Sequence, residues 1–340
     1  MASELPVFIA VDHVTLLSSL LGDGVFDGGT VGSSVVIGTS PTKYLGLEAS
    51  AAPYIDLPAP ATAIVIGMRL YFEFVANDQF IVFQNGSGQE ILNLYRAGVT
   101  GVVQVRRGTA VLGSTTTNFN GAPGDYFEAS IVFDNTVGQV DINVNGVNEV
   151  SVSGVDTVNN AGPLTRVVYT SGGGAGNKTV YHRDGYLKER SSGITDFYGP
   201  IALIPLRVAS DYLNEWTPSA GSLNSEMVDE VTTDGDTTYV EASTPDDTDL
   251  FHLESLSSTD SAILALQLVV NVRAPNGGAP IMGLAIDDGT TRLVSSDRVV
   301  ANSTFGCRAA VFETQADGSS PWDEAAIDAH ICGYKYISTS

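Results

Sequence analysis

The 340-residue sequence is poor in cysteine, lysine and histidine, and each scarcity excludes a class of protein. Two cysteines are too few for a disulfide framework or for a four-cysteine zinc site. Only 16 basic side chains stand against 39 acidic ones, and the formal charge of −23 repels nucleic-acid phosphates and anionic membrane surfaces. The sequence also has no run of about 18 apolar residues. We therefore expect neither nucleic-acid binding nor insertion into a membrane.

The N-terminal residues and the cysteines indicate where the chain folds. Residues 1–6 have no basic region and no long apolar core, so we expect no secretory signal and synthesis in a cytoplasm. Cys307 and Cys332 can stay free, or can pair if the protein ends up outside a cell. Folding in a cytoplasm favours free thiols.

A period of two in the apolar residues dominates the first half of the chain. Phe127, Ala129 and Ile131 alternate with more polar neighbours, and the pair Asn145-Gly146 separates two further alternating runs, which is typical of a β-hairpin. A chain that is 43% hydrophobic and 16% charged can bury a core and is not disordered. We predict strands within residues 64–74, 79–84, 91–95, 102–106, 127–133, 140–144, 147–152, 164–169 and 179–186.

Helix signals are scarce. Residues 14–21 have leucines at helical spacing, and residues 323–329 follow Pro321-Trp322 with Ser320 as the predicted N-cap. Short strands separated by Gly, Asn, Asp and Pro turns indicate an all-β protein built from β-sandwiches.

A change in composition near residue 190 predicts a domain boundary. A chain of 340 residues is longer than a domain with a single hydrophobic core usually is. Residues 190–193 have the composition of a linker. Residues 208–272 then contain 13 acidic side chains and no lysine or arginine. We predict one domain over residues 1–192 and a smaller one over 193–340. Strands of the second domain are expected within residues 237–242, 262–273, 281–287, 304–313 and 333–338.

The sequence contains no catalytic constellation that we can identify. The four histidines have neither a nucleophile elbow nor a partner at the spacing of a zincin helix. No strand carries two closely spaced glutamates of the glucanase type. The glycines of residues 172–176 lack the lysine of a phosphate-binding loop. We therefore predict no catalytic residue, no organic cofactor and no enzymatic activity.

Two sets of side chains are candidates for ligand binding. Clustered carboxylates in loops suit Ca²⁺, although such clusters are also commonly just solvated. The candidate calcium ligands are Asp234, Asp236, Asp246, Asp247 and Asp249. Trp216 and Trp322 would suit contact with a glycan or a protein partner if exposed, and would pin loops to the second core if buried. Tyr54, Phe80 and Phe83 lie in strand-like runs, and we expect most such aromatic side chains to face the core.

The first half of the chain resembles the LamG-like, concanavalin A-like jelly rolls. The residues that carry the resemblance are 44–47, 54–58, 65–74, 126–134, 140–146 and 180–187, including a strand that ends in Asp134 and returns as V-x-I-x-V-N-G. The resemblance implies an N-terminal jelly roll followed by a smaller β-sandwich. Domains of this family in other proteins bind glycans, often with calcium.

The second half resembles a module of structural proteins from tailed bacteriophages. The residues that carry this resemblance are 197–200, 204–206, 216–221, 228–230, 238–240, 249–251, 263–272, 320–329 and 333–335. It implies a virion component, and from it we predict a non-enzymatic structural protein exposed on the particle, tail-associated or in a fibre, that contributes to assembly and host-surface contact. The alternatives are a capsid decoration protein and a glycan-binding adsorption module. The implied partners are other virion proteins, further copies of the same chain, because particle sites are symmetric, and a host-surface glycan.

Overall fold

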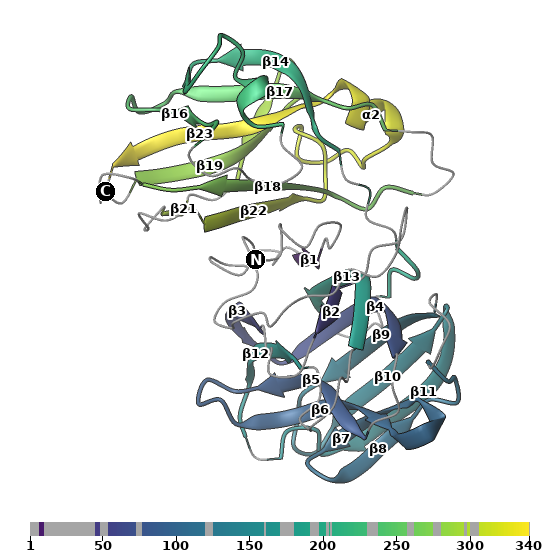
Figure 1. Ribbon diagram of the computed structural model, residues 1–340. Coiled ribbons are helices and arrows are strands. Elements are labelled where there is room, and N and C mark those ends of the chain that lie inside the picture. The colour runs from purple at the N-terminus through teal and green to yellow at the C-terminus, as the bar shows by residue number, and fades with distance from the viewer. Residues whose placement is uncertain are drawn as a thin grey trace. The chain divides into compact units, whose positions relative to one another are not determined.

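The computed structural model describes most of the chain and divides it into two compact units, Met1–Leu203 and Ile204–Ser340 (Figure 1). The described residues are 7–9, 45–47, 54–72, 77–119, 125–159, 161–170, 180–190, 197–201, 204, 206–229, 237–256, 262–274, 280–295, 298–299 and 306–339. The predicted helix at 14–21, the glycines 172–176, Asp234 and Asp236 lie outside them. No helix among the described residues is long and apolar enough to cross a membrane.

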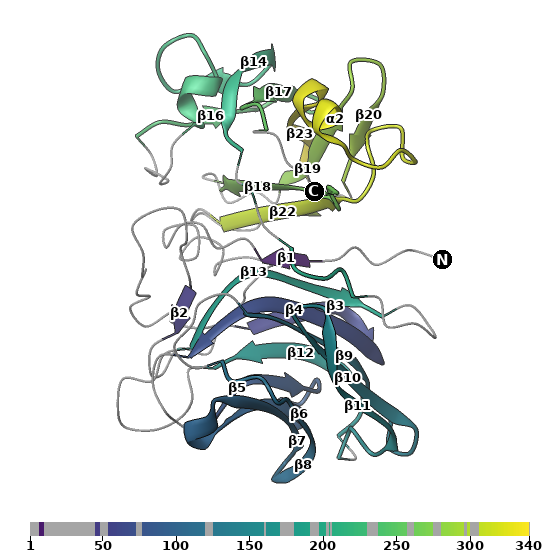
Figure 2. The ribbon, with the colours of Figure 1, turned by 90° about the vertical axis from the view of Figure 1, so that its right-hand side faces the viewer.

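Unit 1 is a sandwich of two antiparallel sheets, as the alternating pattern predicts. Sheet A has the order β1-β13-β4-β9-β10-β11, and β2 also pairs with β13. Its strands are β1 (Val7–Ile9), β2 (Leu45–Leu47), β4 (Ala63–Phe72), β9 (Asp125–Val132), β10 (Gly138–Val144), β11 (Val147–Val155) and β13 (Val180–Glu189). Figure 2 shows β13 and β4 in one layer and β12, β5 and β6 in the other.

Sheet B forms the second layer, with the order β3-β12-β5-β6-β7-β8. Its strands are β3 (Tyr54–Ala61), β5 (Asp78–Gln84), β6 (Glu90–Ala97), β7 (Val102–Arg107), β8 (Ala110–Ser114) and β12 (Leu164–Tyr169), and a 3-10 turn, η1 (Gly98–Thr100), follows β6. The predicted strand at 164–169 matches β12 at both ends, whereas β3 and β8 have no counterpart among the predicted strands.

The core of unit 1 is aromatic. Phe72 and Phe127 of sheet A meet Phe80 of sheet B and the loop residue Phe119 edge to face, with ring centroids 5.3 to 6.5 Å apart. All four side chains are almost fully buried. Such pairs add to the free energy of burying the rings, so they hold the two sheets in register.

The Asn145-Gly146 hairpin is confirmed. It joins β10 to β11, and both residues have positive φ, 49° and 80°, as a type I′ turn requires. The Asn145 side chain also accepts a hydrogen bond from the Tyr126 backbone N–H at 2.8 Å, which ties the turn to β9.

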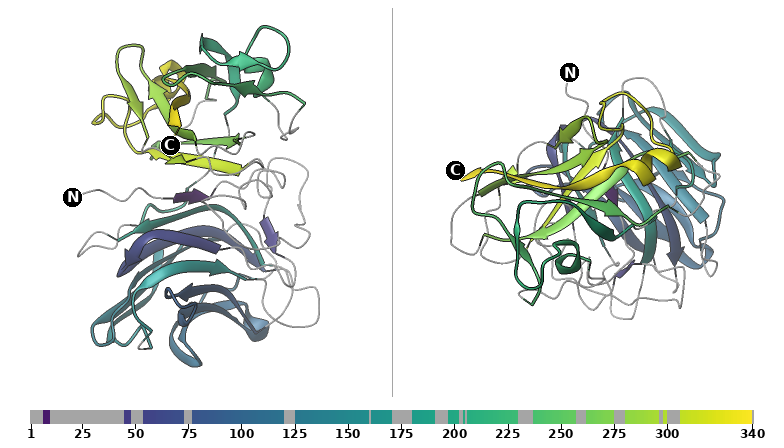
Figure 3. Two further views of the ribbon diagram at one scale, coloured as in Figure 1. Left: turned by 90° about the vertical axis from the view of Figure 1, so that its left-hand side faces the viewer. Right: turned by 90° about the horizontal axis from the view of Figure 1, so that it is seen from above.

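Unit 2 is a smaller sandwich. Sheet C has the order β14-β17-β23-β19-β20, with β21 also paired to β19, and Figure 3 shows β23 in yellow beside β19. The remaining strands form two separate pairs, β15 with β16 and β18 with β22. The elements are β14 (Val208–Asn214), β15 (Thr217–Pro218), η2 (Ser225–Met227), β16 (Val240–Glu241), β17 (Thr248–Leu253), β18 (Leu266–Val272), β19 (Pro280–Asp287), β20 (Arg292–Val294), β21 (Arg298–Val299), β22 (Gly306–Phe312), α2 (Glu324–Ala329) and β23 (Ile331–Thr339).

The core of unit 2 lies between sheet C and the β18–β22 ribbon. Phe251, Met282, Leu284 and Tyr334 of sheet C form a buried cluster, against which alternate residues of β18 pack. The all-β class with two sandwiches therefore holds for the described residues.

The short helix α2 begins one residue after Asp323, which is its N-cap. The Asp323 carboxylate accepts a hydrogen bond from the Ala326 backbone N–H at 2.7 Å. The prediction of Ser320 as the cap is wrong, because the Ser320 hydroxyl donates instead to Asp317 in the preceding turn.

The chain segment after β13 packs against unit 1. The Glu128 carboxylate on β9 accepts hydrogen bonds from the Tyr186 hydroxyl at 2.6 Å and from the Gly199 backbone N–H at 2.9 Å. The Lys188 ammonium lies 3.7 Å from the centre of the Tyr198 ring. These contacts explain why the compact units meet at 203/204, while the domain division at 192/193 stays a prediction drawn from composition.

Candidate functional site

The outer face of sheet B carries an ordered row of side chains in which the two end members, Tyr54 and Arg106, are partly exposed and the three between them are buried. Tyr54, Val168, Val82, Asn93 and Arg106 are successive cross-strand partners from β3 to β7. Cross-strand partners project from the same face of a sheet. The neighbouring row, which includes Ile55, Val167, Phe83 and Leu92, is buried in the sandwich, so the first row points to the opposite side.

Each end of this face has an arginine stacked on a tyrosine. The Arg106 guanidinium carbon lies 3.3 Å from the centre of the Tyr95 ring, and that of Arg166 lies 3.7 Å from the centre of the Tyr54 ring. All four side chains are partly exposed. The stacking fixes flat, partly apolar groups, a guanidinium on a tyrosine ring, on the outer side of the sheet. A ligand can lie on them there.

A recess of about 480 Å³ adjoins the Tyr95–Arg106 stack. Its lining includes Asp78 and Gln79 from the start of β5, Thr109 from the β7–β8 turn, and Thr170 just after β12. The lining therefore combines one aromatic ring with hydroxyl, amide, carboxylate and guanidinium groups. Such a mixture can both stack on a ring-shaped ligand and exchange hydrogen bonds with it.

A hydrogen-bonded network fixes the polar side chains beside the recess. The two Glu90 carboxylate oxygens accept from the Gln79 amide at 2.9 Å and from the Asn93 amide at 2.6 Å. Asn93 is fully buried, and its Oδ1 has no hydrogen-bond partner among the residues that the structure describes. The Arg106 Nε and Nη2 both donate to Gln104 Oε1, at 2.9 and 2.6 Å. The face is thus largely rigid before any ligand binds.

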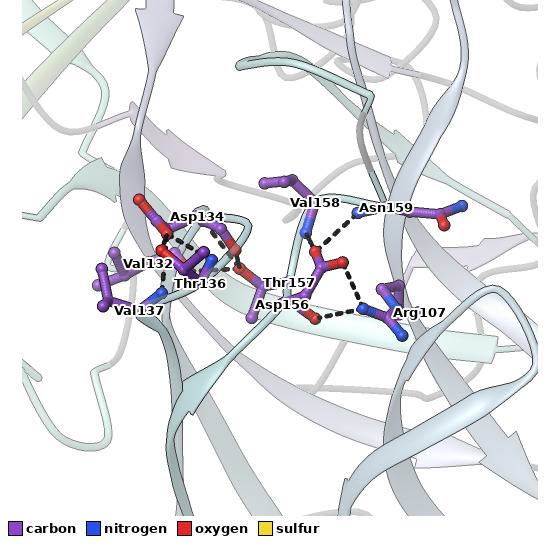
Figure 4. Close-up of polar contacts among 9 residues, drawn as sticks. All are labelled: Arg107, Val132, Asp134, Thr136, Val137, Asp156, Thr157, Val158 and Asn159. Atoms are coloured by element: carbon purple, nitrogen blue, oxygen red, sulfur yellow. Dashed lines mark hydrogen bonds and ion pairs between the residues drawn. The ribbon is translucent and has the colours of Figure 1, made fainter.

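Two carboxylates that follow strands of sheet A, Asp134 after β9 and Asp156 after β11, serve turns instead. Figure 4 shows Asp134 accepting from the backbone N–H groups of Thr136 and Val137, and Asp156 paired with Arg107 at 2.5 Å. The pKa of Asp134 is lowered by these backbone hydrogen bonds and by that of the Thr136 hydroxyl. Both carboxylates are occupied by the fold and offer little to a ligand.

The described members of the predicted calcium set do not share a common ligand position. Asp246 is exposed and pairs with Lys335 at 2.7 Å. Asp249 is buried and accepts from the backbone N–H groups of Glu215 and Trp216 and from the Asn224 amide. Burial raises the pKa of Asp249, opposed by those hydrogen bonds. Among the described residues, no three His, Cys, Asp or Glu side chains gather as a metal-ligand set.

Both tryptophans pack within unit 2. Trp322 is 4% exposed and donates to the Phe312 carbonyl at 2.7 Å. Trp216 is half-buried, lies edge-on to Tyr334 at 4.7 Å and donates to the Asp247 carbonyl at 3.2 Å. Trp322 is too deeply buried to stack on a glycan.

Cys332 is a buried free thiol whose pKa burial raises to about 12, and the Cys307 side chain is outside the described set.

The prediction from sequence missed the outer face of sheet B. The sequence predicted that most of the strand aromatics face the core, but Tyr54 is only half-buried and its neighbour Ile55 is the residue that faces the core. The signal was present in the alternation itself, because Asn93 and Tyr95, and likewise Gln104 and Arg106, are the polar halves of two alternating strands. What the sequence does not show is that these strands are neighbours.

Comparisons with known proteins give structural similarity alone. No protein-family model matches the chain, and no curated protein matches it. An alginate lyase from a Chlorella virus is 13% identical with a TM-score of 0.38, over 54% of this chain and 100% of the lyase. An endo-β-1,4-glucuronan lyase from the fungus Trichoderma reesei is 12% identical with a TM-score of 0.36, over 49% and 94%. A cellulose-induced protein is 18% identical with a TM-score of 0.35, over 51% and 91%.

These comparisons contradict the main functional prediction. The similar structures are polysaccharide lyases and other carbohydrate-related proteins, so the prediction of a non-enzymatic bacteriophage structural protein is wrong, as is the exclusion of an enzyme. The physical reason is that the short motifs behind the second resemblance and the all-β pattern belong to the strands and turns of a sandwich, which unrelated functions share. At these identities the likeness is one of fold and assigns no activity to this chain. The oligomeric state stays a prediction.

Proposed function

We propose that unit 1 is a glycan-binding module and that the outer face of sheet B is its binding surface. The observation that carries the proposal is the pair of arginine-on-tyrosine stacks, Arg106 on Tyr95 and Arg166 on Tyr54, on one face of one sheet. A sugar ring has apolar faces and a rim of hydroxyl groups. A flat stack bordered by amide and hydroxyl groups complements both.

The recess has the dimensions and the chemistry for part of an oligosaccharide. Its volume of about 480 Å³ falls within the range of about 300–1,000 Å³ typical of ligand sites. Gln79, the cross-strand partner of Tyr95, and Thr170 also line the recess. The Gln79 amide donates one hydrogen to Glu90 and the Thr170 hydroxyl donates to the Gln79 carbonyl, so a second amide hydrogen and the hydroxyl lone pairs are left for a ligand. Because Glu90 and Gln104 hold their neighbours in place, binding does not require much ordering of side chains.

The test is a glycan array probed with the full chain, followed by calorimetry on the glycans that bind. Tyr95→Ala removes the ring beneath Arg106 and is expected to weaken binding about tenfold or more, since aromatic side chains at the centre of an interface commonly contribute 2 kcal/mol or more. Tyr212→Ala is the matched control. Tyr212 is a tyrosine of unit 2 that is 50% exposed, so its removal should leave the affinity unchanged.

Two results would contradict the proposal. One is the absence of any bound glycan on a broad array of neutral and acidic polysaccharides. The other is equal affinity of the wild type, Tyr95→Ala and a Tyr54→Ala variant. The same mixtures are analysed for shortened chains, because a face that cleaves a glycan must also bind it.

A further inference from the structure

We infer that the recess beside Tyr95 holds an acidic group of the glycan, a carboxylate or a sulfate, through Arg106. This inference rests on the proposed function and names the class of glycan. It begins from the hydrogen bonds and charges around one guanidinium group.

Arg106 is held in place with unused donors. The flat face of its guanidinium stacks on the Tyr95 ring. Its two hydrogen bonds to Gln104 use the Nε hydrogen and one Nη2 hydrogen. In the part of the chain that the structure describes, Nη1 has no hydrogen-bond partner and no carboxylate pairs with Arg106. A planar guanidinium in this state offers two parallel N–H groups, which match the two oxygens of a carboxylate or sulfate.

The neighbouring charges leave Arg106 as the cation available in the recess. Asp78 also lines the recess, but it is the cross-strand partner of Arg96, a buried arginine whose pKa is lowered by burial and raised by the charge of Asp78. The other nearby acid, Glu90, has both oxygens occupied by side-chain amides. An unpaired, half-buried cation in a chain of charge −23 is an unusual feature that an anionic ligand would complete.

The rest of the protein opposes non-specific attraction of polyanions. Unit 1 still carries more acidic than basic side chains, so an acidic glycan gains from a specific contact at Arg106 and not from the overall field. We therefore expect binding to depend on a correctly placed acidic group rather than on total ligand charge.

The experiment compares acidic hexasaccharides with their neutral counterparts by calorimetry on the full chain. The probes are hexasaccharides of galacturonate and of mannuronate, the same sugars with each carboxyl group reduced to a hydroxymethyl group, and dextran sulfate beside dextran. Reduction is expected to weaken binding tenfold or more. Preference for the uronates identifies a carboxylate as the acidic group, and preference for dextran sulfate identifies a sulfate.

Variants separate Arg106 from general electrostatics. Arg106→Gln should abolish the preference for the acidic form while changing the affinity for the neutral form less than about twofold, and Arg106→Lys should restore part of it, since it keeps the charge without the planar fork. Arg107→Gln is the matched control, because it removes a positive charge one residue away. Arg107 pairs with Asp156, so this variant should keep the preference for the acidic form. Amide exchange of β6 and β7 verifies that each variant keeps its sheet.

The outcomes distinguish this inference from the proposed function. If neutral and acidic forms bind the wild type equally, or if Arg106→Gln retains the preference, the inference is overturned and glycan binding stands. Selective binding of a neutral glycan on the array overturns it as well. If no glycan binds at all, both fail together.

Discussion

Replacing Gly333 by alanine is expected to destabilise unit 2 by about 3 kcal/mol or more. Gly333 lies in β23 opposite Leu250 of β17, in the middle of sheet C. A Cβ atom there would overlap the Asp249 carbonyl oxygen, and would lie 2.9 Å from that carbonyl carbon and 3.0 Å from the Leu250 Cα. These are backbone atoms of a neighbouring strand, so relief requires the two central strands to separate.

Tryptophan fluorescence measures this effect in unit 2 alone. Both tryptophans of the chain, Trp216 and Trp322, lie in that unit and contact its core. Gly333→Ala should lower the midpoint of the fluorescence transition by about 10 °C.

Gly289→Ala is the matched control. Gly289 has a φ of 86° with open space around it, so alanine there costs only the left-handed conformation, about 1 kcal/mol. Equal midpoints for Gly333→Ala and Gly289→Ala would show that β17 and β23 do not approach as closely as described.

Replacing Glu128 by glutamine should flatten the pH dependence of unit 1. Burial raises the pKa of Glu128 above its ordinary 4.5, against hydrogen bonds from Tyr186 and Gly199 and the charge of Lys188. The folded state therefore favours the protonated carboxyl. Its contribution to stability is present below pH 4.5 and is lost as the pH rises through the raised pKa. Glutamine is neutral throughout, so Glu128→Gln should gain stability over the wild type as the pH increases.

The measurement is denaturant unfolding from pH 4 to pH 8, with hydrogen exchange of residues 125–132 and 197–201 as a local readout at each pH. Glu149→Gln is the opposite control. Burial acts to raise the pKa of Glu149, but hydrogen bonds from Thr117 and Thr116 outweigh it and lower that pKa. The Glu149 carboxylate therefore stabilises the folded state at high pH, and this stabilisation is lost as the pH falls. A pH-independent difference between the wild type and Glu128→Gln would contradict the prediction.

Tyr186→Phe estimates the strength of the contact that holds residues 197–201. The Tyr186 ring crosses β4 at Gly67, where any Cβ would overlap it, and its hydroxyl reaches Glu128. Losing a hydrogen bond to a buried carboxylate should cost about 1.5–3 kcal/mol. Faster exchange of residues 197–201 than in the wild type would accompany the loss, and unchanged exchange there would contradict it.

Local pattern was sufficient for most strands of unit 1 and for some of unit 2. The alternation in residues 164–169 and the Asn145-Gly146 turn each depend on a few consecutive side chains, and both are confirmed. The central strand β17 of unit 2 was not predicted, because its short run Thr248–Leu253 has no clear alternation and follows two acidic residues. The cap of α2 was misplaced by three residues for a similar reason, since several neighbouring side chains could accept the same hydrogen bond.

The candidate site required the tertiary structure. Tyr95 and Arg106 are separated by ten residues, and Tyr54 and Arg166 by more than a hundred, so their stacking depends on which strands become neighbours. Strand order is decided by the packing of the whole sandwich and not by any one segment. The same holds for Glu128, whose partners Tyr186 and Gly199 come from later parts of the chain.

The sequence by itself determined the all-β class, the hairpin turns and the acidic character of the second half, because each follows from the composition and spacing of nearby residues. It also supported a particle-protein function that the comparisons contradict, since core-facing alternation says little about a surface. Only the tertiary structure decided which polar side chains share the outer face of sheet B, how Arg106 stacks and keeps unused donors, and where Glu128 becomes buried. Each of these is a relation between strands distant in sequence, set by the free energy of packing two sheets together.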